Sequence, residues 1–569
     1  MRDRLRRAKA AGARTESERV LALPRRDYTG LDLTEELRAP GGTMRLHPIQ
    51  SAALAAIREC DGALLPIGVG QGKSLIGLLA GTVLDARAVV LLTPASTVSQ
   101  LRRTYATMHQ HWRLPPRVVV IGYELLSRPQ GTDLLDRELA GVPEDQILIV
   151  ADEAHSLKAP TSSRTKRVER YLAEHPDIRF VAMSGTLTAK SLKDFAHLGD
   201  WSLRDKAPVP RDPGTLNAWS ACIDVGGRPT DSDWRYATGL WQASYSDPLA
   251  SVVGARRQAM LREAFQSRLR TSPGVVASAA DSLGCSLQIY ERRITTPDDV
   301  EEVLRRIDEG IDFAGDPIPD DVTAWRLARH ASQGFAYFWD WPGGVVDREW
   351  LDARSEWHRM VRWELAERSD RGYDSPFLIA SKLERDLAAG RGGSALHRVW
   401  QDWKAVKDRP APPVGTIWIS DYLVRDAIDW ARRHSPTVIW YDNLAVAAKL
   451  RELGVHVVDA GEPVPLGGQH KVVALSIASH GVGVDGMQYH WHRQIFLAFP
   501  SGGKTAEQVL GRLHRLGQPA DTVEAHVYTH TPPLARALET AIEDAVYIDT
   551  TLGTAQKLLY ADRAVSSAA

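Results

Sequence analysis

Apolar residues in the first part of the chain gather in short continuous runs that are dense in Val, Ile and Leu. These runs are residues 63–67, 88–94, 117–123, 147–150 and 179–186. Segments of helical pattern separate them. A strand that is apolar at every position is typical of a parallel sheet covered by helices on both faces. The pattern therefore predicts an α/β fold.

A second series of such runs begins after residue 430. It consists of residues 437–441, 456–460, 471–478, 494–500 and 522–530. We therefore expect two α/β lobes, the first over residues 41–200 and the second over residues 415–550. Residues 1–40 would form a basic arm and residues 551–569 a tail.

The intervening residues 201–414 have a different pattern, dominated by long helical stretches. The wider range 201–430 holds 14 of the 17 tryptophans. Tryptophan in such helices is more often core or packing surface than a ligand cage. We expect a largely helical, Trp-rich insertion, and a stacking role in nucleic-acid binding is the alternative. Replacement of Trp357 or Trp363 by Ala would distinguish core from binding surface.

The charge of the whole chain favours no class of partner. The net charge is -1, so any nucleic-acid site must be a local patch. Residues 2–26 hold nine Lys/Arg against three acids, which favours a solvated, partly helical arm over a nucleic-acid contact.

The three cysteines include no CxxC pair, which favours a reducing compartment. No apolar run is long enough to span a membrane, and no apolar stretch follows the charged N-terminus. We expect a cytoplasmic monomer. The Ala/Arg-rich composition points to GC-rich coding, as in a bacterium or its phage.

The first chemical motif is a glycine-rich turn between a strand and a helix, in "LLPIGVGQGKSLIGLLAGTVL". Glycines let the backbone curl so that its N–H groups point at phosphate oxygens. The residues that would line this cradle are Gly68, Gly70, Gln71 and Gly72.

Lys73 and Ser74 would open the following helix, whose N-terminus favours an anion. Lys73 would reach the β and γ phosphates, and Ser74 would hold magnesium. The usual spacing G-x-x-x-x-G-K-[ST] has a glycine where this chain has Ile67. The rest of the pattern is intact, so we expect an ATP site.

The second motif is a pair of acids that ends a buried strand, Asp152 and Glu153 in "QILIVADEAHSLKAP". Open α/β sheets bind ligands at the carboxyl ends of their strands. Asp152 would hold magnesium through water, and Glu153 would orient and deprotonate the attacking water.

"DEAH" at 152–155, followed by "SLK", resembles superfamily 2 helicases and translocases, most closely the Swi/Snf-type branch. The resemblance covers residues 44–200 and 415–550. It implies two RecA-like lobes with ATP and magnesium bound between them. "MRLHPIQ" is similar to the family's adenine-reading segment, which places Gln50 on the base. "LLTPASTVSQL" resembles the strand-tracking motif, which places Thr93 and Pro94 near the nucleic-acid backbone.

Two further segments resemble family motifs that link ATP to nucleic acid. "MSGTLT" is similar to the coupling motif, and His155 would connect that motif to the ATP site unless it is simply an interior histidine. The residues implied are Ser184, Gly185 and Thr186. "SHGVGVDGMQYH" lies where the family has a glycine-rich motif. The residues implied there are Gly481, Gly483 and Asp485, the last on the ATP side.

The last motif is "EQVLGRLHRLGQPAD", which matches the family form Q-x-x-G-R-x-x-R-x-G-Q throughout. On a helix, Gln508, Arg512 and Arg515 share one face, and Val509, Leu513 and Leu516 form an apolar face beside it. The resemblance implies that the two arginines reach the γ-phosphate from the second lobe. Arginine suits this role because it is always charged and its planar fork matches phosphate oxygens.

The same stretch also carries signals for helix ends. Thr505 and Gln508 fit a capping box, and Gly517 fits the residue after a helix. "SGGKT" at 501–505 mimics a phosphate loop, but helix entry is the better interpretation because it lacks the earlier glycine. These roles and the arginine role are compatible.

The resemblance implies a nucleic-acid-stimulated ATPase that moves along duplex DNA without strong strand separation. A true helicase or annealing motor on branched DNA or RNA is the alternative. A third possibility is an ATP-gated nucleic-acid clamp with slow turnover that scaffolds a protein partner through the helical segment.

Overall fold

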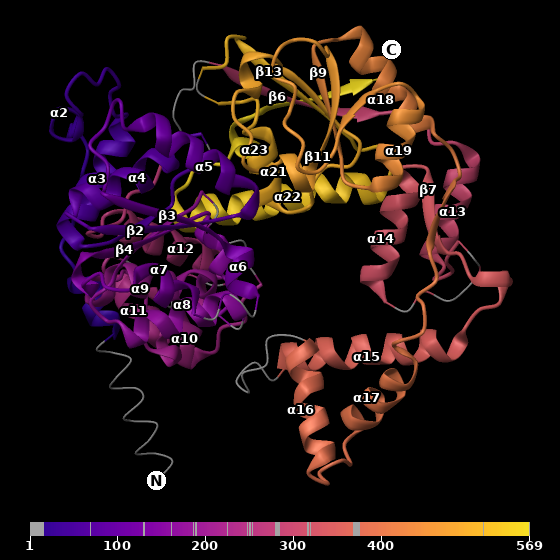
Figure 1. The fold of residues 1–569 in the computed structure, drawn as a ribbon, viewed down its shortest axis with the longest axis horizontal. Helices are drawn as coiled ribbons and strands as arrows, with labels where there is room; N and C mark the ends of the chain where they lie inside the picture. Colours follow the sequence, from indigo (N-terminus) through magenta and orange to yellow (C-terminus); the bar gives the residue numbers. More distant parts are fainter. Residues whose placement is uncertain are drawn as a thin grey trace. The chain divides into compact units, whose positions relative to one another are not determined.

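The computed structural model describes residues 16–567, except 69, 129–130, 132, 161, 186, 188–190, 225, 247, 250–251, 253, 279–284, 314, 316–317, 319, 368–375 and 516. Thr186, Leu516 and residues 1–15 of the basic arm therefore lie outside the described residues. The chain forms two compact units (Figure 1). The large unit holds Met1–Lys158, Arg170–Thr296 and Tyr422–Ala569, and the small unit holds Ala159–Glu169 and Pro297–Asp421.

A five-stranded parallel sheet forms the first half of the large unit. Its order is β1-β5-β4-β2-β3. The strands are β1 (Ala63–Leu65), β2 (Ala88–Thr93), β3 (Arg117–Gly122), β4 (Ile147–Asp152) and β5 (Arg179–Met183). All five fall on the predicted apolar runs. Val89 and Val90, which point to opposite faces, are both fully buried, so both faces are covered as the pattern predicted.

A seven-stranded parallel sheet forms the second half of the large unit, in the order β10-β11-β9-β12-β13-β6-β14. The strands are β6 (Ser286–Arg293), β9 (Thr437–Tyr441), β10 (His456–Val458), β11 (Val472–Ser476), β12 (Arg493–Phe496), β13 (Thr522–Tyr528) and β14 (Asp562–Ser567). The parallel α/β class predicted from the sequence is thus confirmed.

Two strands of this sheet lie outside the predicted runs. β6 pairs with β13 from inside the stretch expected to be helical, and β14 pairs with β6 from the expected tail. Residues 201–296 accordingly belong to the large unit. The helical insertion is therefore shorter than the expected 201–414.

Helices connect and cover the two sheets of the large unit. In chain order they are α2 (Thr34–Leu37), α3 (Pro48–Cys60), α4 (Lys73–Val83), α5 (Ala95–Met108), α6 (Tyr123–Ser127), α7 (Leu134–Leu139), α9 (Ala196–Leu203), α10 (Pro213–Ile223), α11 (Asp231–Gln242), α12 (Gly254–Arg270), α18 (Tyr422–Arg433), α19 (Leu444–Glu452), α20 (Ile477–His480), α21 (Gly503–Leu510), α22 (Pro532–Leu552) and α23 (Lys557–Tyr560). α8 (Ser163–Glu174) crosses the boundary at residue 169.

The small unit combines helices with one antiparallel strand pair. Its elements are α13 (Asp298–Asp308), α14 (Asp321–Ser332), β7 (Phe335–Trp339), α15 (Arg348–Glu367), α16 (Pro376–Ala388), α17 (Ala395–Val406) and β8 (Val414–Trp418), with β7 and β8 paired. Trp357 is 5% exposed and packs with Val361, Ile379 and Trp400, whereas Trp363 is 42% exposed. Of these two tryptophans, Trp357 is therefore a core residue and Trp363 is exposed to solvent.

Residues 16–22 of the basic arm are packed rather than solvated. Residues 16–22 are helical and Val20 is fully buried. Arg19 donates hydrogen bonds to the carbonyl oxygens of Asp205 and Ala207, each at 2.8 Å. The expectation of a solvated arm is therefore wrong for these residues, because their apolar side chains find a surface elsewhere on the unit. Among the helices described, none is long and apolar enough to cross a membrane.

Candidate active site

The glycine-rich turn joins β1 to α4 as the sequence predicted. α4 begins at Lys73, and Gly72 precedes it with a φ of 74°. Gly70 has a φ of 91°. Both values lie in the left-handed region that glycine adopts without strain. A Cβ at Gly72 would overlap the Gln50 side-chain nitrogen, so the position is also closed to larger residues.

Lys73 is buried at the mouth of this turn, where its ammonium faces the turn and the acids together. Its Nζ donates to the carbonyl oxygens of Ile67 and Gly68, both at 3.2 Å. The same Nζ lies 3.5 Å from Oε1 of Glu153. Ser74 follows in the first turn of α4. The turn, its lysine and one predicted acid are thus brought together.

Asp152 and Glu153 lie where β4 ends, at the carboxyl edge of the five-stranded sheet. Burial raises the pKa of Asp152 to about 7, and the neighbouring charge of Glu153 adds to this rise. Burial would also raise the pKa of Glu153, but the charge of Lys73, the hydrogen bond with His155 and the charge of Lys504 hold it below its ordinary value. Glu153 is therefore the ionised acid of the pair.

Glu153 is oriented by two hydrogen-bonding neighbours. Its Oε2 accepts a hydrogen bond from Oγ of Ser184 at 3.2 Å and lies 3.2 Å from Nδ1 of His155. His155 and Ser184 are themselves 2.9 Å apart. The backbone φ of Glu153 is 53°, which is unusual for a residue with a side chain, and such conformations cluster at functional sites. His155 thus does connect the acids to the predicted coupling motif.

That motif also approaches the glycine-rich turn through its backbone. A Cβ at Gly185 would lie 2.9 Å from Cα of Gly68, so only glycine permits this contact. Thr186 is outside the described residues. Ser184 and Gly185 are therefore both placed next to the site.

Gln50 reaches the glycine-rich turn from the first turn of α3. Its Oε1 accepts a hydrogen bond from the backbone N of His47 at 2.9 Å. Its Nε2 donates to the carbonyl oxygen of Gln71 at 3.4 Å. Gln50 thus braces the turn, and its expected contact with a base stays a prediction.

The predicted strand-tracking residues lie at the same edge of the sheet. Thr93 ends β2 and is fully buried, and Pro94 precedes α5. Across the unit, Gly481 ends α20, and a Cβ there would lie 3.0 Å from Cγ2 of Val509. Gly483 has a φ of 81°. Their expected contacts with nucleic acid stay predictions.

The two arginines do not lie on a helix, contrary to the sequence prediction. α21 ends at Leu510, and residues 511–515 form successive turns. α21 begins at Gly503, so "SGGKT" is a helix entry as expected, but Thr505 is inside the helix and makes no capping box. Gly517 has a φ of 84° but lies beyond these turns rather than directly after the helix. A periodic pattern cannot reveal where a helix gives way to tighter turns.

Arg512 is buried in the turns after α21, where backbone oxygens bind it. It is 7% exposed, and it donates to the carbonyl oxygens of Val484 at 2.7 Å and Gln508 at 3.2 Å. Burial lowers its pKa to about 10, the charge of Arg515 adds to this, and Asp485 and Glu153 oppose it. Its charge is therefore felt by the acid of the other sheet.

Arg515 completes the arrangement, because it lies beside the glycine-rich turn. A Cβ at Gly70 would lie 3.4 Å from Cβ of Arg515. Arg515 forms an ion pair with Asp485, which also accepts a hydrogen bond from Gln100 of α5. Asp485 thus bridges the two sheets while it binds one of the arginines.

The sequence did not single out Lys504 or Glu507 as part of this arrangement. The charge of Lys504 acts on Glu153, and the charge of Lys73 acts on Glu507. Lys504 belongs to the "SGGKT" stretch that was interpreted as helix entry alone. Both residues lie on α21, the helix that leads into Arg512, and that position is the signal that would have identified them.

The residues present suit a magnesium nucleotide. Ser74 and Asp152 offer the hydroxyl and carboxylate oxygens that magnesium prefers. The left-handed glycines and the start of α4 offer backbone N–H groups and a favourable dipole for phosphate. No cluster of three or more His, Cys, Asp or Glu side chains suited to a metal occurs among the described residues.

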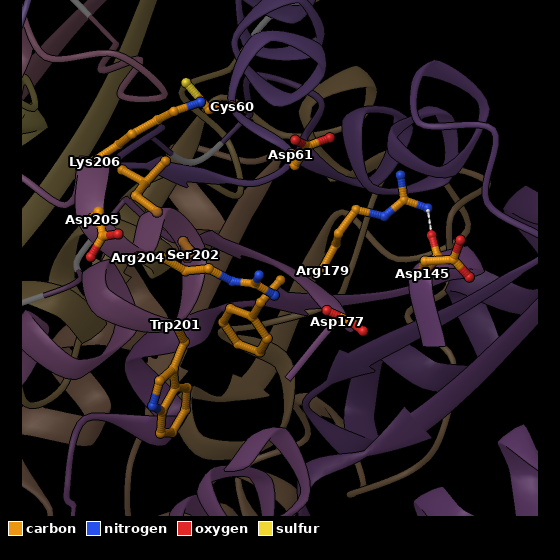
Figure 2. A pocket seen from close by; sticks show the side chains of 12 residues that line it. Cys60, Asp61, Asp145, Asp177, Arg179, Trp201, Ser202, Arg204, Asp205 and Lys206 are labelled. Atoms are coloured by element: carbon orange, nitrogen blue, oxygen red, sulfur yellow. Dashed lines mark hydrogen bonds between the residues drawn. The ribbon is translucent and has the colours of Figure 1, made fainter. Parts of the chain in front are cut away.

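A cavity of about 430 Å³ lies elsewhere, at the amino edge of the five-stranded sheet (Figure 2). It is bounded by Asp145, which precedes β4, and by Arg179, which begins β5. Arg179 is bound by the carbonyl oxygens of Asp145 and Leu84. Because ligands of open α/β sheets bind at the opposite, carboxyl edge, the cavity is not the candidate site.

Comparison of the chain with protein-family models and with curated proteins gave no match.

Proposed function

We propose that this protein hydrolyses ATP between two RecA-like lobes, one built on each sheet, and that nucleic acid stimulates the reaction. Within this class we favour a translocase on duplex DNA. The resemblance of the motifs to the Swi/Snf-type branch supports this choice, and it is an argument by analogy.

One observation carries the proposal. Arg515 lies beside the glycine-rich turn although more than 400 residues separate them in the sequence, and the charges of Arg512 and Glu153 act on each other across the two sheets. Each sheet alone offers half of the groups that phosphoryl transfer requires, because the reaction needs positioning and charge stabilisation around the γ-phosphate.

The residues of the first lobe would bind and activate. Lys73 would exchange the carbonyl oxygens of Ile67 and Gly68 for phosphate oxygens. Glu153, ionised and oriented by Ser184 and His155, would accept a proton from the attacking water. Magnesium held near Ser74 and Asp152 would supply charge neutralisation between the β and γ phosphates.

The residues of the second lobe would stabilise the charge that develops. Arg515 would leave Asp485, and Arg512 would leave the Val484 carbonyl, when a phosphate offers bidentate oxygens in their place. This exchange would draw the two sheets toward the nucleotide. Loss of the phosphate would return each arginine to its protein partner, which is the basis of a conformational cycle.

The test is ATP turnover by the purified protein, alone and with single-stranded DNA, duplex DNA, branched DNA and duplex RNA. Glu153→Gln is the inactive control. Strong stimulation by plain duplex DNA, lost in the control, would support the proposal. Stimulation mainly by branched DNA or RNA would favour a helicase or annealing motor. Tight ATP-dependent binding with little turnover would favour a clamp.

A further inference from the structure

The base of the glycine-rich turn is bound by two segments that belong to none of the motifs. The carbonyl oxygen of Pro66, directly after β1, accepts a hydrogen bond from the backbone N of Ser278 at 3.1 Å. The same oxygen accepts a hydrogen bond from Oγ1 of Thr554 at 3.3 Å. Ser278 is 3% exposed and Thr554 is fully buried, so both bonds are shielded from water.

Ser278 belongs to residues 274–278, which run alongside β1 and form a parallel bridge with it between Val275 and Leu64. The backbone N of Leu64 donates to the carbonyl oxygen of Gly274 at 3.0 Å. Oγ of Ser278 accepts a hydrogen bond from the backbone N of Gly68 at 3.0 Å. This stretch therefore fixes the start of the turn, and it leaves the N–H groups near Lys73 to a phosphate.

Thr554 belongs to residues 553–557, which join α22 to α23 and which we call the coupling segment. α22 ends at Leu552, and Gly553, which follows it, has a left-handed φ of 67°. A Cβ there would lie 3.1 Å from Nε of Arg270 on α12, so the chain turns in a confined space. Three residues after Thr554, Lys557 reaches α21.

Lys557 binds Glu507 on α21 in two ways. Its backbone N donates to Oε2 of Glu507 at 2.7 Å, and its Nζ lies 3.6 Å from Oε1. Glu507 is 2% exposed, and a buried carboxylate that loses its partner is strongly destabilised. Gln508, the first residue of the arginine motif, follows it directly. The coupling segment thus contacts Pro66, at the base of the glycine-rich turn, at one end and α21 at the other.

We propose that the coupling segment positions the arginine motif relative to the glycine-rich turn, with Thr554 as a positioning residue for ATP hydrolysis. A change at either end is transmitted over only four residues, Thr554 to Lys557, whose contacts at both ends are buried. The inference rests on the proposed function for its kinetic consequence, but the contacts that define the segment do not depend on it.

The first test is Thr554→Val, which removes the hydroxyl and keeps the shape, with Thr554→Ser as the rescue. We expect nucleotide affinity to stay within about threefold and kcat to fall by about ten- to 100-fold, as for other small misplacements of catalytic groups. Thr554→Ser should restore most of kcat. Thr550→Val, an equivalent change on α22 at a hydroxyl bound only to its own helix, is the matched control.

Unchanged kcat in Thr554→Val would overturn the proposal. A matching loss in Thr554→Ser, or a loss of nucleotide affinity as large as the loss of kcat, would also overturn it, because either would indicate a structural role alone.

A second measurement separates this inference from the proposed function. Amide hydrogen exchange of the nucleotide-free protein needs no catalysis. In Thr554→Val we expect faster exchange both in residues 67–74 and in residues 503–510. Faster exchange in only one of these regions, or in neither, would contradict the coupling segment. Absence of ATP turnover in the unaltered protein would contradict the proposed function instead.

Discussion

The two sheets of the large unit contribute opposite charges to the candidate site. The five-stranded sheet places two acids and one lysine at its carboxyl edge, with the glycine-rich turn. The seven-stranded sheet contributes Lys504, Arg512 and Arg515 from α21 and the turns after it. The groups of the first sheet come from two motifs about 80 residues apart, whereas Lys504, Arg512 and Arg515 lie within 12 residues of one another in the sequence. Under the proposed function, the binding groups would come with the first sheet and the rate-enhancing charge with the second.

The largest expected effect tests the second half of this comparison. Arg512→Ala or Arg515→Ala should lower kcat for ATP by about 10³–10⁵-fold, the range of arginine groups that stabilise phosphoryl transfer. Nucleotide affinity should change far less, because Lys73 and the glycine-rich turn remain. Steady-state turnover and equilibrium binding of a fluorescent nucleotide measure the two quantities. A loss of nucleotide affinity equal to the loss of kcat would contradict the proposed assignment of nucleotide binding to the first sheet and rate enhancement to the second.

Glu153→Gln tests the first half. The amide keeps the size of the side chain but cannot accept a proton, so kcat should fall by about 10²–10⁴-fold. Nucleotide should still bind, and single-turnover assays should show that the chemical step is slowed. Residual turnover above a tenth of the original rate would show that another group is the base.

Gly72→Ala sharpens the comparison at the turn itself. The left-handed φ of 74° and the overlap with Gln50 should cost about 1–3 kcal/mol, typical of a strained backbone position. We expect that cost to appear as weaker nucleotide binding. Gly141→Ala, at a similar φ of 78° with nothing near its Cβ, is the matched control for strain alone. Equal nucleotide affinities in the two variants would show that the overlap with Gln50 does not matter.

The dependence of magnesium affinity on pH should be smaller. Burial, and then the charge of Glu153, raises the pKa of Asp152 to about 7, so this carboxyl holds a proton at lower pH. Magnesium needs the ionised form. Its apparent affinity should therefore fall by about tenfold per pH unit below 7 and level off above it. Titration of magnesium at several pH values, in the presence of nucleotide, measures this. Asp152→Asn should remove the dependence, and a flat profile in the unaltered protein would contradict it.

The smallest expected effect lies outside both sheets. Trp363→Ala should change ATP turnover without nucleic acid by less than about twofold, as for surface positions away from a site. Weaker stimulation by DNA would indicate that this exposed indole stacks on bases. A large loss of the basal turnover would show that the site is not confined to the two sheets.

The sequence predicted those parts of the fold that bury apolar side chains at every position. β2 and β9 are such strands. β6, "SLQIYERR", alternates apolar with polar residues, and β14 lies at the edge of the sheet and is largely polar, so neither carries the same signal. The pairing of β6 with β13 and β14 is set by tertiary contacts, which override weak strand propensity.

The site shows a similar limit. Lys73 and Asp152 were predicted because each belongs to a motif of fixed local spacing. The helix expected to carry Arg512 ends earlier, at Leu510. The sequence did not predict this end, because the same residue periodicity continues through the tighter turns that follow a helix. The bonds of Ser278 and Thr554 to Pro66 have no local signal, because each involves a backbone atom more than 200 residues away.

The order of strands in the seven-stranded sheet has a consequence for synthesis. β6 leaves the ribosome with 125 residues of the small unit still to follow before β9, and both of its neighbours, β13 and β14, are made later still. Until then β6 presents unpaired backbone groups along both sides, a template for association with other chains. Its polar and arginine-rich sequence suits that interval, because charged strands resist such association. The six residues of β14 then act as a cover, without which β6 would stay an open edge in the finished protein.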